Sequence, residues 1–299
     1  MGHDNPVMRS RIVNMSFRQF SLTYESPAYW RVTFDNPPIN VLDGATIPEL
    51  QRLIALMESD PELRVVVFDS ANPEYFIAHF SAAAGVTTIT TALPNGLYPW
   101  VDIVDRLARL PVVTIAAIRG RARGVGSEFA LACDIRFGSA EKAIFAQIEV
   151  GAGLFPGGGA LERLPLLTGR GRAFEIVLGA DDFDAATAER YGWINRAIPD
   201  AEFERIVSQF ARRIASFDRL PLREAKRLLN AHCEQPQSTA INESQQTFFE
   251  ALSWPTAVSR AQRLTKLGSG QDSDLERNYG SRLEHLMDDQ TTDEHKEAP

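Results

Sequence analysis

The feature that most constrains this chain is a passage from a buried strand into a helix, interrupted by glycines, within the stretch from Gly120 to Val150. Val112 to Ile118 is apolar and predicts the strand, and Ser127 to Ala132 predicts the helix. Three glycines separate them: Gly120, Gly124 and Gly126. A glycine turn that leads into a helix N-terminus presents unpaired backbone N–H groups, which favour an anion or an oxygen that is becoming one.

Two ionisable side chains accompany this passage. Glu128 falls in the first turn of the expected helix, beside the unpaired amides, and Glu149 follows after another short apolar strand. Two carboxyl groups brought to a donor site suggest acid–base chemistry on a carbonyl compound. The local pattern leaves a plainer interpretation open, in which the glycine turn only packs the helix closely on the strand and the glutamates are surface or capping residues.

Three commoner glycine-loop functions do not fit. The dinucleotide-binding fingerprint needs a third glycine where the chain has Phe129, and the later stretch from Gly151 to Pro156 fails because proline stands at the required position. A P-loop needs Gly-Lys-Ser/Thr, which does not occur. A nucleophile elbow around Ser127 would need glycines where Val125 and Phe129 stand.

Composition narrows the class of protein. With 299 residues and 44% hydrophobic content, the chain can form one large domain or two ordinary ones around a real core. Its net charge of −8 argues against nucleic-acid and membrane partners. Cys133 and Cys233 form no metal or redox spacing, so we expect no metal and two reduced thiols in a cytoplasmic protein. The sequence shows neither a membrane-spanning run nor a signal-peptide pattern.

The first half of the chain alternates between strand and helix patterns. Strands are expected at Tyr29 to Phe34, Leu63 to Phe68 and Phe76 to Ser81. Thr46 is expected to cap a helix through a capping box with Glu49. The buried face of that helix repeats at helical spacing through Leu50, Leu53, Ile54 and Met57. Ala82 to Pro99 lacks periodicity and predicts a loop or a broken helix near the ligand, before a helix that ends at Pro111.

The later half changes character near residue 200. Asp184 is expected to cap a helix that Gly192 ends, and Trp193 to Ile198 is the last expected strand. These patterns predict an α/β core over residues 16–199 and a helical region over residues 200–286. A flexible terminus over residues 1–15 and a disordered acidic tail over residues 287–299 complete the expected organisation.

Taken together, these motifs resemble the crotonase superfamily, the enoyl-CoA hydratase/isomerase proteins, from about Val32 to Pro199. The segments that carry the resemblance are Asn36-Pro-Pro-Ile-Asn40-Val-Leu, Phe76-Ile-Ala-His-Phe80, Gly124-Val-Gly-Ser-Glu128, Phe145-Ala-Gln-Ile-Glu149-Val, Pro156-Gly-Gly-Gly and Phe183 to Asn195. The resemblance implies an α/β fold, a spiral of ββα units with a helical C-terminal region. It also implies a homotrimer or a dimer of trimers, with contacts carried by residues 200–286.

The resemblance also implies a site. Family members use two backbone N–H groups to hold the thioester oxygen as it becomes an enolate, and these match the amides of Phe80 and Val125. The two catalytic glutamates of the hydratases match Glu128 and Glu149. The residues expected to bind the substrate and its coenzyme A are Asn40, Val41, Ala78, His79, Gly124 and Gly126. An acyl-CoA thioester is then the substrate, and no further cofactor is expected.

Two positions depart from the family pattern. His79 stands where the first oxyanion loop usually has glycine, so it either packs or touches a polar group on the substrate. Ile148 stands where proline commonly precedes the second carboxyl. A separate pattern comes from Arg119, Arg121 and Arg123, which alternate along an extended segment and are expected to face one side. They could contact CoA phosphates or a neighbouring subunit, or form a solvated or salt-bridged edge.

The paired glutamates favour hydration of a 2-enoyl-CoA. Double-bond isomerisation, decarboxylation and thioester hydrolysis use the same oxyanion site without needing both carboxyls. A non-catalytic acyl-CoA-binding protein is an alternative from a second class. A serine peptidase with Ser127 as its nucleophile is a third.

Overall fold

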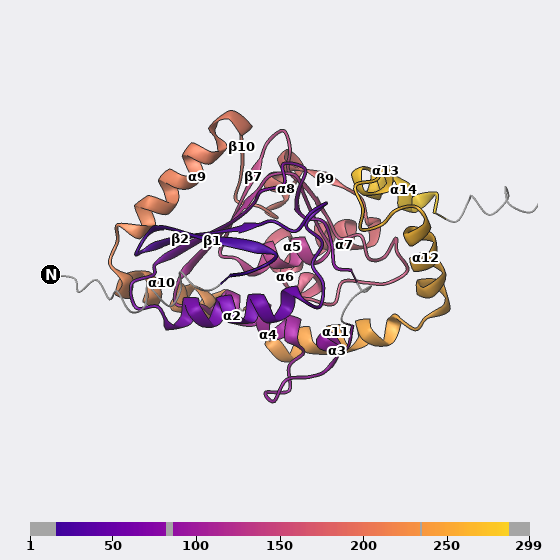
Figure 1. Cartoon of the computed structure of the whole chain (residues 1–299), viewed down its shortest axis with the longest axis horizontal. Coiled ribbons are helices and arrows are strands. Elements are labelled where there is room, and N and C mark those ends of the chain that lie inside the picture. Colours follow the sequence, from indigo (N-terminus) through magenta and orange to yellow (C-terminus); the bar gives the residue numbers. More distant parts are fainter. Residues whose placement is uncertain (1–15, 82–85, 234, 287–299) are drawn as a thin grey trace, which may run out of the picture.

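The computed structural model describes residues 16–81, 86–233 and 235–286, without the side chains of Val86 and Thr87. The flexible terminus predicted for residues 1–15 and the acidic tail predicted for residues 287–299 lie outside these ranges. Strands alternate with helices as far as β10, and the described residues that follow form helices and their connections (Figure 1). Within the described ranges, no helix combines the length and the apolar character needed to cross a membrane.

Two sheets form the core. The larger has the strand order β1-β2-β3-β5-β7-β10, in which only β1 and β2 are antiparallel. Its strands are β1 (Phe20–Ser26), β2 (Tyr29–Phe34), β3 (Val65–Ser70), β5 (Val113–Ile118), β7 (Ile135–Ser139) and β10 (Arg196–Ile198). The smaller sheet has the order β4-β6-β8-β9. Its strands are β4 (Tyr75–Ile77), β6 (Arg121–Arg123), β8 (Ile144–Ala146) and β9 (Phe183–Asp184).

Successive strands alternate between the two sheets. β3, β5 and β7 enter the larger sheet, and the strand that follows each of them enters the smaller one. Helices follow each pair: α3 (Val86–Thr90) and α4 (Pro99–Arg109), then α5 (Val125–Ala132), then α6 (Ala160–Thr168) and α7 (Arg170–Gly179). This repetition of two strands and a helix confirms the α/β fold of ββα units predicted from the sequence.

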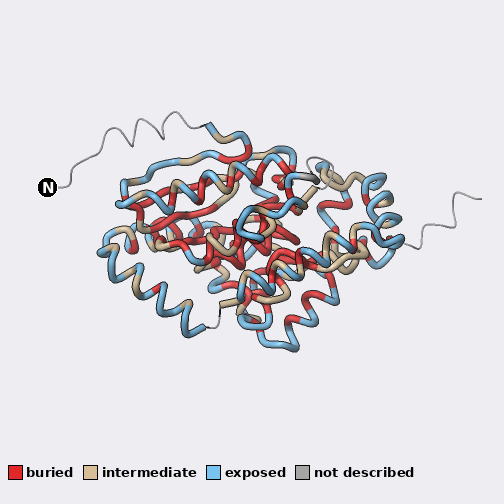
Figure 2. Tube along the Cα trace, turned by 90° about the horizontal axis from the view of Figure 1, so that it is seen from below, coloured by how far each residue is buried: buried red, intermediate tan, exposed pale blue. Residues whose placement is uncertain are grey.

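Helices cover both faces of the larger sheet, which explains the uninterrupted apolar run in β3. Val66 and Phe68 lie in the cluster that includes α2 (Thr46–Ser59), α4 and α5, whereas Val65 and Val67 pack with α9 (Asp200–Ala215). Alternate residues of a strand point to opposite faces, so a strand covered on both sides must be apolar throughout. Buried residues accordingly run through the interior between the outer helices (Figure 2).

The remaining helices extend the core at its C-terminal end. They are α8 (Ala185–Tyr191), α10 (Arg219–His232), α11 (Ser238–Ala251), α12 (Pro255–Lys266), α13 (Asp274–Arg277) and α14 (Tyr279–Glu284). The segment from α12 to α14 lies at the end of the molecule opposite α10 (Figure 1). Leu264, Tyr279 and Leu283 of this segment pack with Ala146 and Ile148, so the C-terminal helices close over the end of β8.

The capping box predicted for α2 is wrong. Thr46 lies inside the helix, and Asp43 Oδ1 instead accepts from the amides of Ala45 at 2.8 Å and Thr46 at 3.1 Å. Glu49 accepts from the amides of Arg18 and Gln19 and so fixes the chain that enters β1. Asp43, which precedes Thr46 in the sequence, therefore accepts from the free amides at the start of α2. Short polar side chains near a helix start compete for these amides.

Other local predictions are confirmed. Asp184 accepts a hydrogen bond of 2.7 Å from the Thr187 amide at the start of α8, and Gly192 ends that helix with a φ of 81°. The apolar face predicted for α2 is buried. Within the stretch from Ala82 to Pro99, α3 is a short helix of five residues, and residues 82–85 lie outside the described part of the chain.

The three alternating arginines form ion pairs within the chain. Arg119 Nε lies 2.9 Å from Asp200, and Arg121 Nη1 lies 3.0 Å from Glu74. Arg123 is fully buried, and its guanidinium donates to Asp182. Of the expected arrangements, the structure therefore matches the salt-bridged edge, with one member drawn into the interior.

Candidate active site

A cavity of about 430 Å³ lies between the N-terminus of α5, the loop after β8 and the C-terminal helices. Its lining includes all four of the predicted catalytic and oxyanion residues together with residues from α11, α12 and α14. The lining residues are His79, Phe80, Ser81, Ile89, Trp100, Gly124, Val125, Glu128, Ile148, Glu149, Ala152, Leu154, Gly157, Gly158, Gln245, Phe248, Phe249, Leu252, Ala261, Leu264, Thr265, Ser269, Gly270 and Tyr279. The cavity is therefore mostly apolar, with a few polar groups, as ligand sites generally are.

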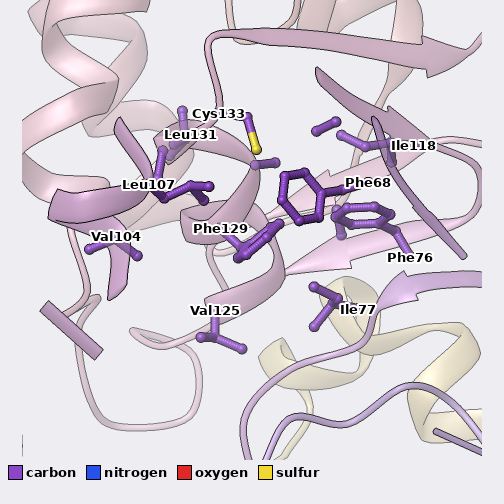
Figure 3. Packing of buried hydrophobic residues seen from close by; sticks show 14 of the residues in the cluster. Phe68, Phe76, Ile77, Val104, Leu107, Ile118, Val125, Phe129, Leu131 and Cys133 are labelled. Carbon is purple, nitrogen blue, oxygen red and sulfur yellow. The ribbon is translucent and has the colours of Figure 1, made fainter. Parts of the chain in front are cut away.

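Two glycines place α5 against the cavity. Gly124 has φ 49° and ψ −119°, and a Cβ there would lie 2.7 Å from Glu149 Oε1. A Cβ on Gly126 would lie 2.3 Å from the Ile77 carbonyl oxygen, so only glycine lets the first turn of α5 approach β4 this closely. Figure 3 shows Val125 at this end of the helix and Phe129 one turn later, whose ring lies 5.0 Å from that of Phe68. The contact between Phe129 and Phe68 thus holds α5 against the core.

The Phe80 amide lies in a segment that pairs with Leu42. The Leu42 amide donates to the His79 carbonyl at 3.0 Å, and the Ser81 amide donates to the Leu42 carbonyl at 2.8 Å. Because neighbouring residues of an extended chain point their backbone groups in opposite directions, the Phe80 amide faces away from Leu42. It makes no backbone hydrogen bond with another described residue.

The Val125 amide is the second predicted donor. Val125 is the first residue of α5, and the amides of the first turn have no partner inside a helix. Its own amide makes no hydrogen bond with backbone groups elsewhere in the described chain. Phe80 and Val125 both line the cavity, so the two residues that carry these amides border the same space from neighbouring elements.

Glu128 is buried at the cavity wall but has backbone partners. Its Oε1 accepts from the Gly158 amide at 2.7 Å and from the Ala160 amide at 3.4 Å. Burial raises the pKa of Glu128 to about 7, against the effect of these two amides, which favour the carboxylate. The side chain can therefore be ionised near neutral pH.

Glu149 is half-buried and has fewer partners. Its Oε2 is buried without a hydrogen-bond partner among the described residues, and only its own backbone amide favours the carboxylate form. Burial, followed by the nearby charge of Glu128, raises the pKa of Glu149 to about 8. Two interacting carboxyl groups lose their protons in two steps that belong to the pair. Since only Glu128 receives amide hydrogen bonds from its neighbours, Glu149 is the group that keeps its proton to higher pH.

The structure brings together six of the ten predicted site residues at the cavity. They are His79, Phe80, Gly124, Val125, Glu128 and Glu149. Asn40, Val41, Ala78 and Gly126 do not line it, so their part in CoA binding stays a prediction. Asn40 is buried instead at a φ of 55°, and its Nδ2 donates to Ser70 at 2.7 Å and to the Phe76 carbonyl at 3.2 Å.

His79 lies at the cavity with a partner from the far end of the chain. Its Nε2 lies 2.6 Å from Glu276 Oε1, and its Nδ1 lies 3.2 Å from the Phe80 carbonyl oxygen. Its ring also lies 5.9 Å from that of Tyr279. The side chain is therefore held between two acceptors at the cavity, and its contact with a polar group on the substrate stays a prediction.

Sequence reasoning missed two further groups at the cavity. Tyr279 lines it from α14. Trp100 lines it from α4, and its Nε1 has no hydrogen-bond partner among the described residues. A Cβ added at Gly158 would lie 2.2 Å from both Trp100 Nε1 and Glu128 Oε2, so these atoms are close neighbours. No short sequence motif marks either aromatic residue, since each reaches the cavity through tertiary packing.

The arrangement does not suit a serine nucleophile. Ser127 is fully buried and does not line the cavity, and its Oγ has no hydrogen-bond partner in the described part of the chain. An activated serine needs a base within hydrogen-bond reach. The described residues also contain no cluster of three or more His, Cys, Asp or Glu that could hold a metal ion.

Comparison with known proteins agrees with this geometry. The sequence profile of the enoyl-CoA hydratase/isomerase family matches residues 26–257. A short-chain-enoyl-CoA hydratase from Clostridium acetobutylicum is 30% identical over 229 residues, which span 74% of this chain and 85% of that protein. A crotonyl-CoA hydratase from Syntrophomonas wolfei is 31% identical over 207 residues, which span 67% of this chain and 77% of that protein.

Solved structures extend the match to most of the chain. A Streptomyces avermitilis protein classed as an enoyl-CoA hydratase has a TM-score of 0.85 and 36% identity, covering 91% of this chain and 98% of its own. An enoyl-CoA hydratase from Mycobacterium avium subsp. paratuberculosis has a TM-score of 0.73 and 26% identity, covering 83% of this chain and 99% of its own. The chain therefore has the crotonase fold and belongs to the enoyl-CoA hydratase/isomerase family.

Proposed function

We propose that the protein hydrates a 2-enoyl-CoA thioester. The observation that carries the proposal is the pair Glu128 and Glu149, two carboxyl groups with raised pKa values that line one mostly apolar cavity together with Phe80 and Val125. Hydratases named for short-chain enoyl-CoA and crotonyl-CoA are among the relatives of this chain, which supports a substrate of the same class. Isomerisation, decarboxylation and thioester hydrolysis would not require both carboxyls.

The environments of the two glutamates assign their roles. Glu128, whose carboxylate accepts two backbone amides, is the base that takes a proton from water as the water oxygen bonds to C3. Glu149, which has no such partners, is the acid that gives its proton to C2. The addition leaves Glu128 protonated and Glu149 ionised, so a proton must return from Glu128 to Glu149 before the next turnover.

The amides of Phe80 and Val125 would hold the thioester oxygen. Charge moves onto this oxygen when water adds to C3, and oriented donors in a site that excludes water stabilise that charge. One such donor typically contributes about 2.7–4 kcal/mol. The apolar lining would place the acyl chain, with the thioester carbonyl at the two amides.

Loss of the enoyl-thioester absorbance of crotonyl-CoA tests this function. With the wild-type protein, the absorbance should fall and no free thiol should be released. With the E128Q/E149Q double variant, the absorbance should stay constant. Thiol release would indicate hydrolysis, and binding of crotonyl-CoA without any reaction would indicate a non-catalytic acyl-CoA-binding protein. Either result would overturn the proposal.

We further infer a homotrimer or a dimer of trimers, with no nucleic-acid partner, in the cytoplasm. α10 exposes Leu220, Leu228 and Leu229, and α7 exposes Phe174 and Leu178. Extended exposed apolar surfaces mark protein contacts. We expect residues 200–286 to carry much of this contact. Light scattering at micromolar concentration checks this inference, and a monomer would contradict it.

A further inference from the structure

One residue of the C-terminal segment touches both elements that lead to the free amides. Glu276 lies in the four-residue helix α13 and is fully buried. Its Oε1 lies 2.6 Å from His79 Nε2, and the residue after His79 is Phe80. Its backbone carbonyl accepts from Arg123, and the two residues after Arg123 are Gly124 and Val125. A single residue thus joins the two segments that carry the proposed oxyanion donors.

The contact with His79 is between charged groups. Both ring nitrogens of His79 face acceptors, the Glu276 carboxylate and the Phe80 carbonyl, and only the imidazolium can donate to both. Burial alone would lower the pKa of His79, but the hydrogen bond and charge of Glu276 hold it above its usual value. Among the described residues, the other charged or titratable groups that face this pair are Arg123, Tyr279 and Tyr75.

The contact with His79 also shifts the pKa of Glu276. Burial would raise the pKa of Glu276, but the hydrogen bond and charge of His79 hold it below its usual value. The Gly270 amide also donates to Glu276 Oε1 at 2.8 Å. The ion pair is therefore complete above the lowered pKa of Glu276 and is lost as the pH rises through the raised pKa of His79.

The contact with Arg123 is equally buried. Arg123 has no exposed surface, and its Nε donates to Asp182 Oδ1 at 2.7 Å while Nη1 reaches the Glu276 carbonyl. β6 ends at Arg123, so this anchor fixes the strand end from which the backbone turns into α5. A charge buried without partners is costly, so these groups hold one another in place.

We propose that Glu276 is a positioning residue that aligns the Phe80 and Val125 amides on the thioester oxygen. It touches neither amide and acts through His79 and through the end of β6. The proposal rests on the proposed function for its catalytic consequence. The alignment itself concerns only contacts within this chain.

The first test is kinetic. E276A removes the carboxylate, and E276Q keeps its shape and one acceptor but removes its charge. D274N is the matched control, since Asp274 lies on the same helix with an exposed side chain that pairs with Arg282. A misplacement of about 1 Å can cost about 10²-fold in rate, so we expect E276A to lose roughly 10- to 100-fold in kcat. We expect a smaller loss in E276Q, an unchanged KM in both variants and an unchanged kcat in D274N.

The second test reads the oxyanion site without hydration. Acetoacetyl-CoA ionises to an enolate where two amides hold its thioester oxygen, and the enolate absorbs in the ultraviolet. The bound enolate fraction should fall in E276A and stay at the wild-type level in D274N. If wild-type protein binds acetoacetyl-CoA and E276A ionises it equally well, the positioning role is overturned. If wild-type protein does not bind it, the proposed function has failed instead.

The third test needs no substrate. NMR titration of the folded protein should show the His79 pKa falling in E276Q relative to D274N, because the carboxylate charge is gone. The backbone amide chemical shifts of Phe80 and Val125 should move in E276A and E276Q and stay at the wild-type values in D274N, because the segments that carry these amides change position. Unchanged shifts at both amides would overturn the proposal whatever reaction the protein performs.

Discussion

The cavity has two walls that are held in different ways. The core wall is the part of the cavity that contains Gly124, Glu128 and Glu149. Strand pairing holds it in place, because β6 pairs with β8 along its whole length. Gly126 also packs closely on Ile77. The C-terminal wall, formed by the segment from α12 to α14, has only short helices at its end and is attached by side chains such as Leu283. The two glutamates thus lie on the wall that backbone pairing holds. The opposite wall is held by side-chain packing, and we expect it to open at lower cost.

The largest effect should come from the core wall. E149Q removes the proton donor and E128Q removes the base, and we expect each to lower kcat by about 10²–10⁴-fold while the fold remains. Glutamine keeps the size of the side chain, so KM should change little. Steady-state hydration of crotonyl-CoA measures both. Near wild-type turnover in either variant would remove that residue from the mechanism.

The pH profile should separate the two carboxyls. Glu128 must be ionised and has a pKa of about 7, so kcat/KM should fall below pH 7 as Glu128 takes up a proton. Glu149 must be protonated and has a pKa of about 8, so kcat/KM should fall above pH 8 as it loses its proton. The expected result is a bell with its maximum between these values, each limb approaching about tenfold per pH unit. A profile flat from pH 5 to 9 would contradict the assignment.

The core wall could be predicted from sequence because its signals are local. The glycines, Glu128 and Glu149 lie within one continuous stretch, and the role of each can be inferred from the residues next to it in the sequence. The continuous apolar sequence of β3 likewise predicts that both faces of this strand are covered. β1 was not predicted, although Phe20, Leu22 and Tyr24 alternate with polar residues as an edge strand with one exposed face does.

The C-terminal wall could not be predicted because its contacts are distant in sequence. Glu276 meets His79 across 197 residues, and α13 has only four residues, too few for a periodic pattern. The capping box at Thr46 failed for a related reason. Two carboxylates, Asp43 and Glu49, were available, and which of them would meet the free amides depended on where the chain before β1 lies.

A cavity in the C-terminal wall tests whether this wall opens independently. Leu283 is buried against Gly151, and L283A should cost about 2–5 kcal/mol of local stability. Hydrogen exchange should become faster in α13 and α14 but not in β3 or β5. KM for acyl-CoA should rise, and kcat should fall as well, because opening of α13 releases Glu276 from His79. The matched control is L53A on α2, in the main core, which should lower the overall stability without this local effect. Equal exchange changes in both variants would remove the distinction between the walls.

The smallest effect concerns a helix cap at a residue that does not line the cavity. Asp184 accepts from the Thr187 amide, and D184A should lower the free energy of unfolding by about 0.5–2 kcal/mol. D184N keeps the acceptor and should lose less. The hydrogen bond from Thr187 holds the pKa of Asp184 below its usual value, so its contribution is present above that usual value and is lost as the pH falls through the lowered pKa.

Denaturant unfolding at pH 7 and near pH 3 measures this difference, which should shrink at the lower pH. Because Asp184 does not line the cavity, kcat and KM should stay at the wild-type values in D184A. This result would show that a modest loss of overall stability does not by itself disturb the cavity, so that a change of KM in L283A reports the C-terminal wall. A fall in kcat in D184A would instead mean that the core wall depends on the stability of the whole fold, and the two walls would no longer be separable by mutation.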